Sequence, residues 1–511
     1  MCACCLLAFR ETIRCKTSGR FLAALTVLSL SSALRADDFA TDPIDEIQVT
    51  ASRRAESAAV VPAAVTVIGP DAIHRQKLIT DALAAQRGVF LQQTTPGQGA
   101  AIIRGLKGSE VLHLVDGFRL NNTIFRNAPT QYLSLVPVAS AERVEVLRGA
   151  PASLYGSDAV GGVVQVVSRF PEFDGDGREL RRDLHMAFDT ADLGKLLRGT
   201  LEYGSKTIAG LLSAEYLGTG DRRVGGGERI GPSGYESLGG RIALTFNTAD
   251  DRTWLIDAQA AEQPETPRAD ELVPGFGQTE PSSAEFFFEP NGRYFVHARH
   301  TAADALWSAD WTVDLGWQCV VDDRRTRDFG STARLLESNR SDLAGVTVSA
   351  AGTSERMSWI AGAEFYHDEV SSGRRTVDTQ TGETDEVAAR FPDGSSARQA
   401  ALYGNARLRA GDRHSVSGGL RYSDVRVELA ATAATPTVPG RWHRPRRPHS
   451  AAERRAAAAC RFARGPGIDG VGAVRRRPGP PEPAGCERHT HRPERHAGLG
   501  NAEPARELVV R

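Results

Sequence analysis

Residues 142–168 read ERVEVLRGAPASLYGSDAVGGVVQVVS, and they decide the fold of the domain around them. The stretch begins with a β-prone run, Glu142–Gly149, and ends with a second such run, Val163–Val167. Small residues and turn formers separate the two runs, and Gly161 and Gly162 come directly before the second. The pattern predicts two strands joined by an irregular connection.

The sequence on the N-terminal side alternates between strands and short helices. Val65–Ile68, Ile102–Gly105 and Val111–Val115 have strand composition, and a turn at Asp116–Gly117 closes the last of them. Asp71 is a candidate cap for one short helix, and Thr80 for a second over residues 81–86 that Gly88 stops. We therefore expect a mixed α+β domain over residues 60–170 that folds by itself.

The body of the chain, residues 180–430, reads as amphipathic strands. In one segment Trp311, Val313, Leu315 and Trp317 share a face, while polar and small residues take the other. An alternation of period two over about ten residues is typical of membrane β-barrel strands, and a soluble β-sandwich shares it. The expected loop from Gln263 to Arg293, rich in Pro and Gly, favours the barrel because such barrels carry long loops on one side.

Three segments resemble the TonB-dependent outer-membrane receptors. The run DEIQVTA at residues 45–51 resembles the TonB box of that family, within a segment over residues 44–51. Ile103-Arg104-Gly105 followed by VLHLVDG at 111–117, and then residues 142–168, closely follow the pattern of its plug domain. The resemblance assigns the TonB box to Asp45, Glu46, Ile47, Gln48, Val49, Thr50 and Ala51. It assigns the plug motif to Arg104, Gly105, Asp116, Gly117, Glu142, Arg143, Arg148, Gly149, Tyr155, Gly156, Gly161 and Gly162.

The resemblance implies an α+β plug domain followed by an antiparallel transmembrane β-barrel in the outer membrane of a Gram-negative bacterium. It implies uptake of an iron chelate, haem or a ferric siderophore, with no cofactor. It names as partners TonB with its inner-membrane energising complex, the ligand and outer-membrane lipid, but no nucleic acid. Polar contacts between plug and barrel are expected from Arg104, Glu142, Arg143 and Arg148.

The two ends of the chain differ from its middle. Of the net charge of -1, residues 1–36 carry +4, residues 37–440 carry -14 and residues 441–511 carry +9. The apolar run at 21–34 behind basic residues predicts a signal peptide over residues 1–36, with a buried helix as the alternative. Residues 441–511, rich in Arg and Pro, predict no strand and read like DNA translated out of frame, an aberrant tail. Residues 180–430 have room for ten to twelve strands, about half of a 22-stranded barrel.

No enzyme motif survives inspection. The chain lacks a complete dinucleotide fingerprint, a phosphate loop and a nucleophile elbow, so we expect no catalytic residue. The histidines His113, His297, His300 and His367 are scattered, and the sequence assigns none as a metal or haem ligand. Two alternatives to transport stay open: a surface receptor or signal transducer, and a non-functional truncated product.

Overall fold

The structure is a computed structural model that describes residues 48–49, 53, 56–57, 61, 63–125, 132–149, 152–173, 175, 177–249, 251–411, 414–430 and 461–464. The expected signal peptide, most of the tail and the TonB-box residues Asp45, Glu46, Ile47, Thr50 and Ala51 lie outside this set. Gln48–Val49 form β1, which pairs with β2, Glu56–Ser57. None of the helices in the described part is both long and apolar enough to cross a membrane.

A small domain over residues 61–173 is built on a five-stranded sheet of order β3-β8-β9-β6-β7. The strands are β3 (Ala64–Ile68), β8 (Ala141–Arg148), β9 (Gly162–Ser168), β6 (Val111–Val115) and β7 (Phe118–Arg119). Only β6 and β9 run parallel; the other neighbours in this sheet are antiparallel. The remaining elements are α2 (Pro70–His74), α3 (Ile79–Ala84), β4 (Val89–Gln92), β5 (Ala100–Ile103), η1 (Gly108–Glu110), η2 (Leu133–Leu135), η3 (Val138–Ser140), α4 (Ala152–Tyr155) and η4 (Ser157–Ala159).

Three local expectations for this domain were wrong. Thr80 does not cap a helix, because α3 already begins at Ile79 and the Asp81 carboxylate accepts the Leu78 N–H at 3.2 Å. Asp71 likewise lies inside α2, which opens at Pro70. Arg104 and Gly105 leave the strand, since φ values of 55° and 82° turn the chain directly after β5.

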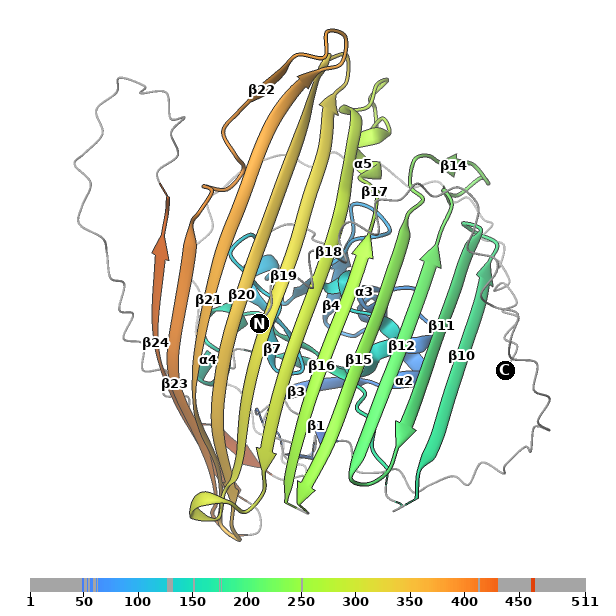
Figure 1. Ribbon diagram of the computed structural model, residues 1–511. Coiled ribbons are helices and arrows are strands. Elements are labelled where there is room, and N and C mark those ends of the chain that lie inside the picture. Colours follow the sequence, from blue (N-terminus) through green and yellow to red (C-terminus); the bar gives the residue numbers. More distant parts are fainter. Residues whose placement is uncertain are drawn as a thin grey trace, which may run out of the picture. The chain divides into compact units, whose positions relative to one another are not determined.

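A large antiparallel sheet follows, of hydrogen-bonded order β10-β11-β12-β15-β16-β18-β19-β20-β21-β23-β24-β25 (Figure 1). Its strands are β10 (Glu179–Asp189), β11 (Gly194–Gly204), β12 (Ile208–Gly218), β15 (Glu236–Ala249), β16 (Arg252–Gln263), β18 (Ser283–Ala302), β19 (Asp310–Asp328), β20 (Ala333–Thr353), β21 (Met357–Asp378), β23 (Ser396–Arg409), β24 (His414–Glu428) and β25 (Arg461–Arg464). In the described residues, β25 comes from the tail for which the sequence predicted no strand.

The connections differ at the two ends of the large sheet. Short turns such as 205–207, 250–251 and 354–356 lie at one end, at the bottom of Figure 1. Long connections over 219–235, 264–282 and 379–395 lie at the other end, and they carry β13 (Arg222–Arg223), β14 (Arg229–Ile230), β17 (Thr266–Pro267), α5 (Ala269–Leu272) and β22 (Thr384–Glu386). The loop expected to run to Arg293 is shorter than predicted, because β18 already begins at Ser283.

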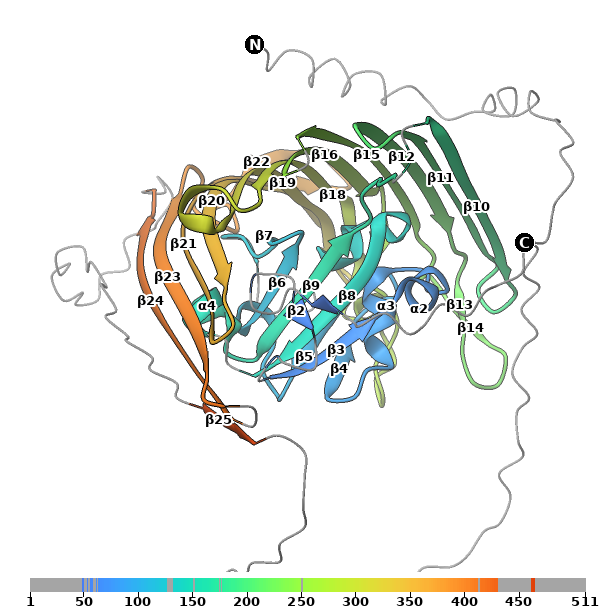
Figure 2. The ribbon, with the colours of Figure 1, turned by 90° about the horizontal axis from the view of Figure 1, so that it is seen from below.

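The large sheet has one apolar face and one polar face. On β15 the side chains of Ile242 and Leu244 are exposed, whereas that of the adjacent residue Arg241, on the opposite face of the strand, is 1% exposed. Figure 2 shows the sheet curving around the small domain, so the polar face lines the inside. The core of the small domain continues into this inner face, where Phe118 packs with Phe295 and Tyr366. Polar-inside alternation fits a membrane barrel wall and not a soluble sandwich, whose buried faces are apolar.

Candidate functional site

The interface between the small domain and the inner face of the large sheet contains most of the buried polar chemistry. Asp116, at the turn between β6 and β7, is one anchor of it. Its carboxylate accepts the Ser168 amide at 2.7 Å and the Ser168 hydroxyl at 2.6 Å. Its backbone carbonyl accepts the Arg299 guanidinium of β18 at 2.6 Å. The predicted motif turn Asp116–Gly117 therefore lies against the inner face of the large sheet, which we call the wall.

The other charged motif residues do not reach the wall, which corrects the expected polar contacts. Arg143 pairs inside the small domain, with Glu145 at 2.9 Å and Glu142 at 3.3 Å. Arg148, directly before Gly149, donates to the carbonyl of Arg87. Arg104 is exposed at the turn after β5. The charged side chains of these strands serve the small domain itself.

The glycines of the motif permit close backbone approach. A Cβ on Gly162 would lie 2.5 Å from the Leu147 carbonyl oxygen, and one on Gly161 would lie 2.9 Å from the Leu106 Cβ. Gly156 has a φ of +92°, and a Cβ there would meet Arg421 of the wall at 3.2 Å. Close packing and left-handed backbone explain why this segment is rich in glycine.

Tyr155 belongs to a buried cluster that joins three distant parts of the chain. The Arg53 guanidinium lies over the Tyr155 ring at 4.8 Å and over the Tyr403 ring of β23 at 4.4 Å. It also pairs with Glu364 of β21 at 2.8 Å, and that carboxylate is fully buried. Arg421 of β24 pairs with the same Glu364 and donates to the Leu154 carbonyl at 3.0 Å. We call Arg53, Tyr155, Glu364, Tyr403 and Arg421 the Arg53 cluster.

The Arg53 cluster fixes the segment that leads out of the predicted TonB box. Arg53 comes two residues after Ala51. Leaving the cluster would cost Arg53 its contacts with two aromatic rings and its ion pair with the buried Glu364 carboxylate. Sequence reasoning missed Arg53 and Glu364, because nothing local distinguishes Arg53 from Arg54 and its partner is 311 positions away.

Further wall residues grip the backbone of the small domain, and the sequence did not predict them either. Arg198 of β11 donates to the carbonyls of His74, Gln76 and Lys77 at 2.8–2.9 Å. Glu215 of β12 accepts the amides of Val138 and Ala139 at 3.2 and 2.9 Å. Towards the end with long connections, Thr123 bonds Asp368 and Tyr132 bonds Asp322.

The four histidines lie in separate environments. His113 is 4% exposed on β6, and burial lowers its pKa to about 4. His297 pairs with Asp314 at 2.8 Å, His300 stacks on Trp254, and His367 pairs with Glu369. Across the described residues no three His, Cys, Asp or Glu side chains gather as a metal site would require.

Comparison with known proteins agrees with the geometry of the small domain. Residues 57–163 match the family model described as the TonB-dependent Receptor Plug Domain. Residues 57–163 of this chain therefore form a plug domain of the TonB-dependent receptor type. The small domain is this plug, and the large antiparallel sheet has the fold of a barrel wall.

One of the relatives that match this chain is similar to it over part of its length. The vitamin B12 transporter BtuB of Vibrio vulnificus (strain CMCP6) is 36% identical over 155 residues, which is 30% of this chain and 25% of that protein. The chain thus matches only about a quarter of that relative's length.

Two solved structures share the fold at low identity. The copper transporter OprC has a TM-score of 0.61 at 14% identity, covering 71% of this chain and 55% of that one. The ferric yersiniabactin uptake receptor FyuA from Yersinia pestis has a TM-score of 0.56 at 14% identity, covering 73% of this chain and 58% of that one. This chain spans little more than half of the length of these receptors.

Proposed function

We propose that this receptor lies in the outer membrane of a Gram-negative bacterium and takes up an iron chelate, haem or a ferric siderophore, with energy delivered by TonB. The single observation that carries the proposal is a wall that is apolar outside and polar inside, with a family plug bonded to its inner face. A wall of that kind suits a lipid surround, and a plugged lumen suits gated entry of a large solute.

Aromatic residues mark both margins of the apolar outer band. Trp254, Trp311 and Trp359 lie within the first three residues of their strands, at the end with short turns. Phe365 and Tyr422 lie on the same outer face towards the other end, and they are 44% and 50% exposed. Aromatic girdles of this kind flank the lipid-facing band of outer-membrane barrels. The end with long connections is then extracellular, and the end with short turns is periplasmic.

The predicted TonB box supplies the route for energy. An extended segment such as residues 45–51 binds a partner by adding a strand to its sheet. A pull on this segment acts on the β1–β2 pairing and on Arg53, and through the Arg53 cluster it reaches α4 of the plug and three wall strands. The position of Arg53 supports a mechanism in which the partner opens the plug by displacing this contact.

The class of ligand rests on the family and on its named members. FyuA is named for ferric yersiniabactin, which supports an iron chelate. The 36% sequence identity to a vitamin B12 transporter over 155 residues favours cobalamin as the second candidate. An iron chelate and cobalamin are both too large for the ordinary pores of the outer membrane, so either ligand suits a barrel with a plugged lumen.

Uptake by cells that lack their own receptors tests the proposal. Cells producing this chain are supplied with ⁵⁵Fe-labelled siderophores, haem or ⁵⁷Co-labelled cobalamin, and accumulation is measured with and without TonB. We expect TonB-dependent accumulation of one iron source. Ile47→Pro removes a strand hydrogen bond and should abolish uptake while binding at the surface persists, whereas Ile47→Val should retain uptake. Accumulation of cobalamin alone would select the second candidate, and full uptake by Ile47→Pro would refute the TonB-box assignment.

A further inference from the structure

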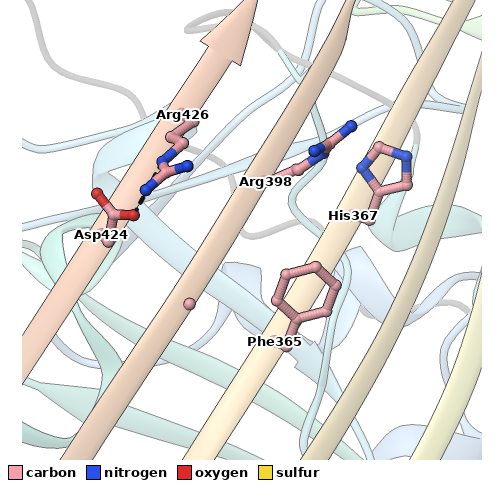
Figure 3. A pocket seen from close by; sticks show the side chains of 6 residues that line it. Phe365, His367, Arg398, Asp424 and Arg426 are labelled. Carbon is pink, nitrogen blue, oxygen red and sulfur yellow. Dashed lines mark hydrogen bonds and ion pairs between the residues drawn. The ribbon is translucent and has the colours of Figure 1, made fainter. Parts of the chain in front are cut away.

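A pocket of about 410 Å³ lies on the outer face of the barrel wall, across β21, β23 and β24 (Figure 3). Its lining residues are Phe365, His367, Arg398, Ala400, Asp424 and Arg426. Alternation along β21 places them outside, because Glu364 bonds Arg53 and Asp368 bonds Thr123 of the plug, so the odd-numbered residues between them point away from it. The pocket therefore faces the surroundings of the barrel and not its lumen.

The pocket lies at the extracellular margin of the apolar band. On the periplasmic side of it, the outer face presents Leu402, Leu420 and Tyr422, which are 61%, 60% and 50% exposed. Phe365 of the aromatic girdle lines its apolar side. Asp424 lies level with Phe365 through Ala400, and His367, Arg398 and Arg426 lie one outward position beyond that level. On the proposed membrane position, this is the level of the headgroups of the outer leaflet.

The charges in the pocket are unbalanced. His367 is the direct cross-strand neighbour of Arg398, and Arg398 is the direct neighbour of Arg426. Two arginines directly opposite each other on one face destabilise a sheet unless an anion lies between them. Asp424 supplies one carboxylate, which pairs with Arg426 at 3.1 Å. Arg398 makes no ion pair or hydrogen bond anywhere in the described part of the chain.

Other polar residues at this level of the outer face satisfy each other. Arg340 pairs with Asp342 through two hydrogen bonds of 2.5 and 2.7 Å. Glu262 accepts the Tyr294 hydroxyl at 2.9 Å, and Glu369 bonds His367 at 3.0 Å. The Arg398–Arg426 pair stands out because the one carboxylate of the pocket, Asp424, pairs with Arg426 and leaves Arg398 without a counter-ion among the described residues. An additional anionic group would complete it.

We propose that this pocket binds a phosphate group of a phosphorylated lipid of the outer leaflet. This inference rests on the proposed membrane position. A phosphate monoester suits two adjacent guanidinium groups, since each presents a fork of donors that matches its oxygens. The acyl chains of such a lipid would lie along the apolar band directly below, against Leu402 and Leu420. A pocket that joins two arginines to an apolar surface thus recognises both ends of one lipid.

Native mass spectrometry of the purified full chain in detergent tests the site. The probes are diphosphoryl lipid A, its dephosphorylated form, and inorganic phosphate alone. We expect retention of diphosphoryl lipid A, and a loss of about tenfold or more in affinity for the double variant Arg398→Gln/Arg426→Gln. Arg398→Lys should restore part of the binding. Arg252→Gln, an exposed arginine at the periplasmic end of β16, is the matched control and should bind like wild type.

Three results would overturn the proposal. Equal binding by the double variant and wild type would show that the arginines do not hold the lipid. Equal binding of the dephosphorylated lipid would reduce the site to an apolar contact. Competition by inorganic phosphate at equal concentration would make it a site for the free ion. Because binding is measured in detergent, absence of uptake in cells would count against the proposed function and leave this result unchanged.

Discussion

Glu364 is the residue on which the contact between the N-terminal segment and the wall depends. Its fully buried carboxylate serves both Arg53 and Arg421, whose side chains are 13% and 4% exposed. Glu364→Gln leaves two buried guanidinium groups without their counter-ion, a loss of about 3–5 kcal/mol for a pair of this kind. We expect Arg53 to leave the cluster, so that trypsin cuts after it far faster than in wild type.

A tryptic time course read by mass spectrometry measures this release. Glu262→Gln is the matched control, because Glu262 lies on the outer face of the wall, where its carboxylate accepts a hydrogen bond from the Tyr294 hydroxyl. Its cleavage rate at Arg53 should equal that of wild type. Unchanged cleavage in Glu364→Gln would mean that the ion pair does not hold the segment.

His113 makes the stability of the plug depend on pH. Its pKa is lowered to about 4 in the folded plug by burial, against about 6.5 in an unfolded chain. Between these values the unfolded chain binds a proton that the folded plug does not, so stability falls as the pH drops from 6.5 towards 4. The full loss is about 3 kcal/mol. His113→Gln should remove this part of the pH dependence.

Hydrogen exchange of the peptide that contains β6, corrected for the intrinsic exchange rate at each pH, measures the effect. Wild type should lose protection between pH 7 and pH 4.5 by more than the His113→Gln variant does. Parallel loss in both proteins would assign the pH dependence to other groups.

At the scale of elements, β19 and β20 form a notch for Phe118 of the plug. A Cβ on Gly316 would lie 2.4 Å from the Phe118 ring, and one on Gly345 would lie 2.4 Å from the Tyr366 ring and 3.0 Å from Phe118. Gly316→Ala forces the Phe118 ring to move, at a cost of about 1–3 kcal/mol. We expect a lower thermal midpoint for loss of plug protection from proteolysis.

Gly418→Ala is the control for this change, because a Cβ at Gly418 meets nothing within 4 Å. It lies on β24 of the same sheet, so it reports what the substitution costs a strand without the clash. Equal midpoints for the two variants would show that Phe118 does not need the notch.

The sequence predicted those elements whose signal is local. The valine run of β9, the β6 strand with its DG turn, and the two-sided alternation of the wall all follow from spacing alone. The errors at Thr80 and Arg104 came from boundaries that tertiary contacts decide. The plug glycines and Tyr155 came from the family motif, whereas Arg53, Glu364 and Arg198 act across the plug–wall interface, which no local pattern encodes.

For the whole molecule, the strands of the wall alternate between polar side chains that point inward and apolar side chains that point outward, so the two faces of the sheet suit different surroundings. Inward side chains such as Arg241, Asp257 and Gln259 are buried against the plug or one another, and the outward neighbours Ile242 and Ile256 are exposed. Monomeric soluble proteins rarely expose contiguous apolar patches larger than a few hundred Å², because apolar surface in water gains no stabilising contact. The apolar outer face of the wall therefore requires lipid, and the cost of a charge on it should depend on how deep that charge lies in the bilayer.

Leu420 of β24 and Leu408 of β23 form a matched pair on the outer face of the sheet. They are 60% and 51% exposed; Leu420 lies opposite Gly404, midway along the apolar band, while Leu408 lies one residue before β23 ends. An arginine at the mid-plane of a bilayer costs about 2–4 kcal/mol, and one at the interface about 0–1 kcal/mol. Leu420→Arg should therefore lower the stability of the chain in lipid bilayers by that larger amount, and Leu408→Arg should change it little. Guanidinium titration of the chain refolded into vesicles measures both, and an equal effect of the two variants would contradict a membrane that spans this band.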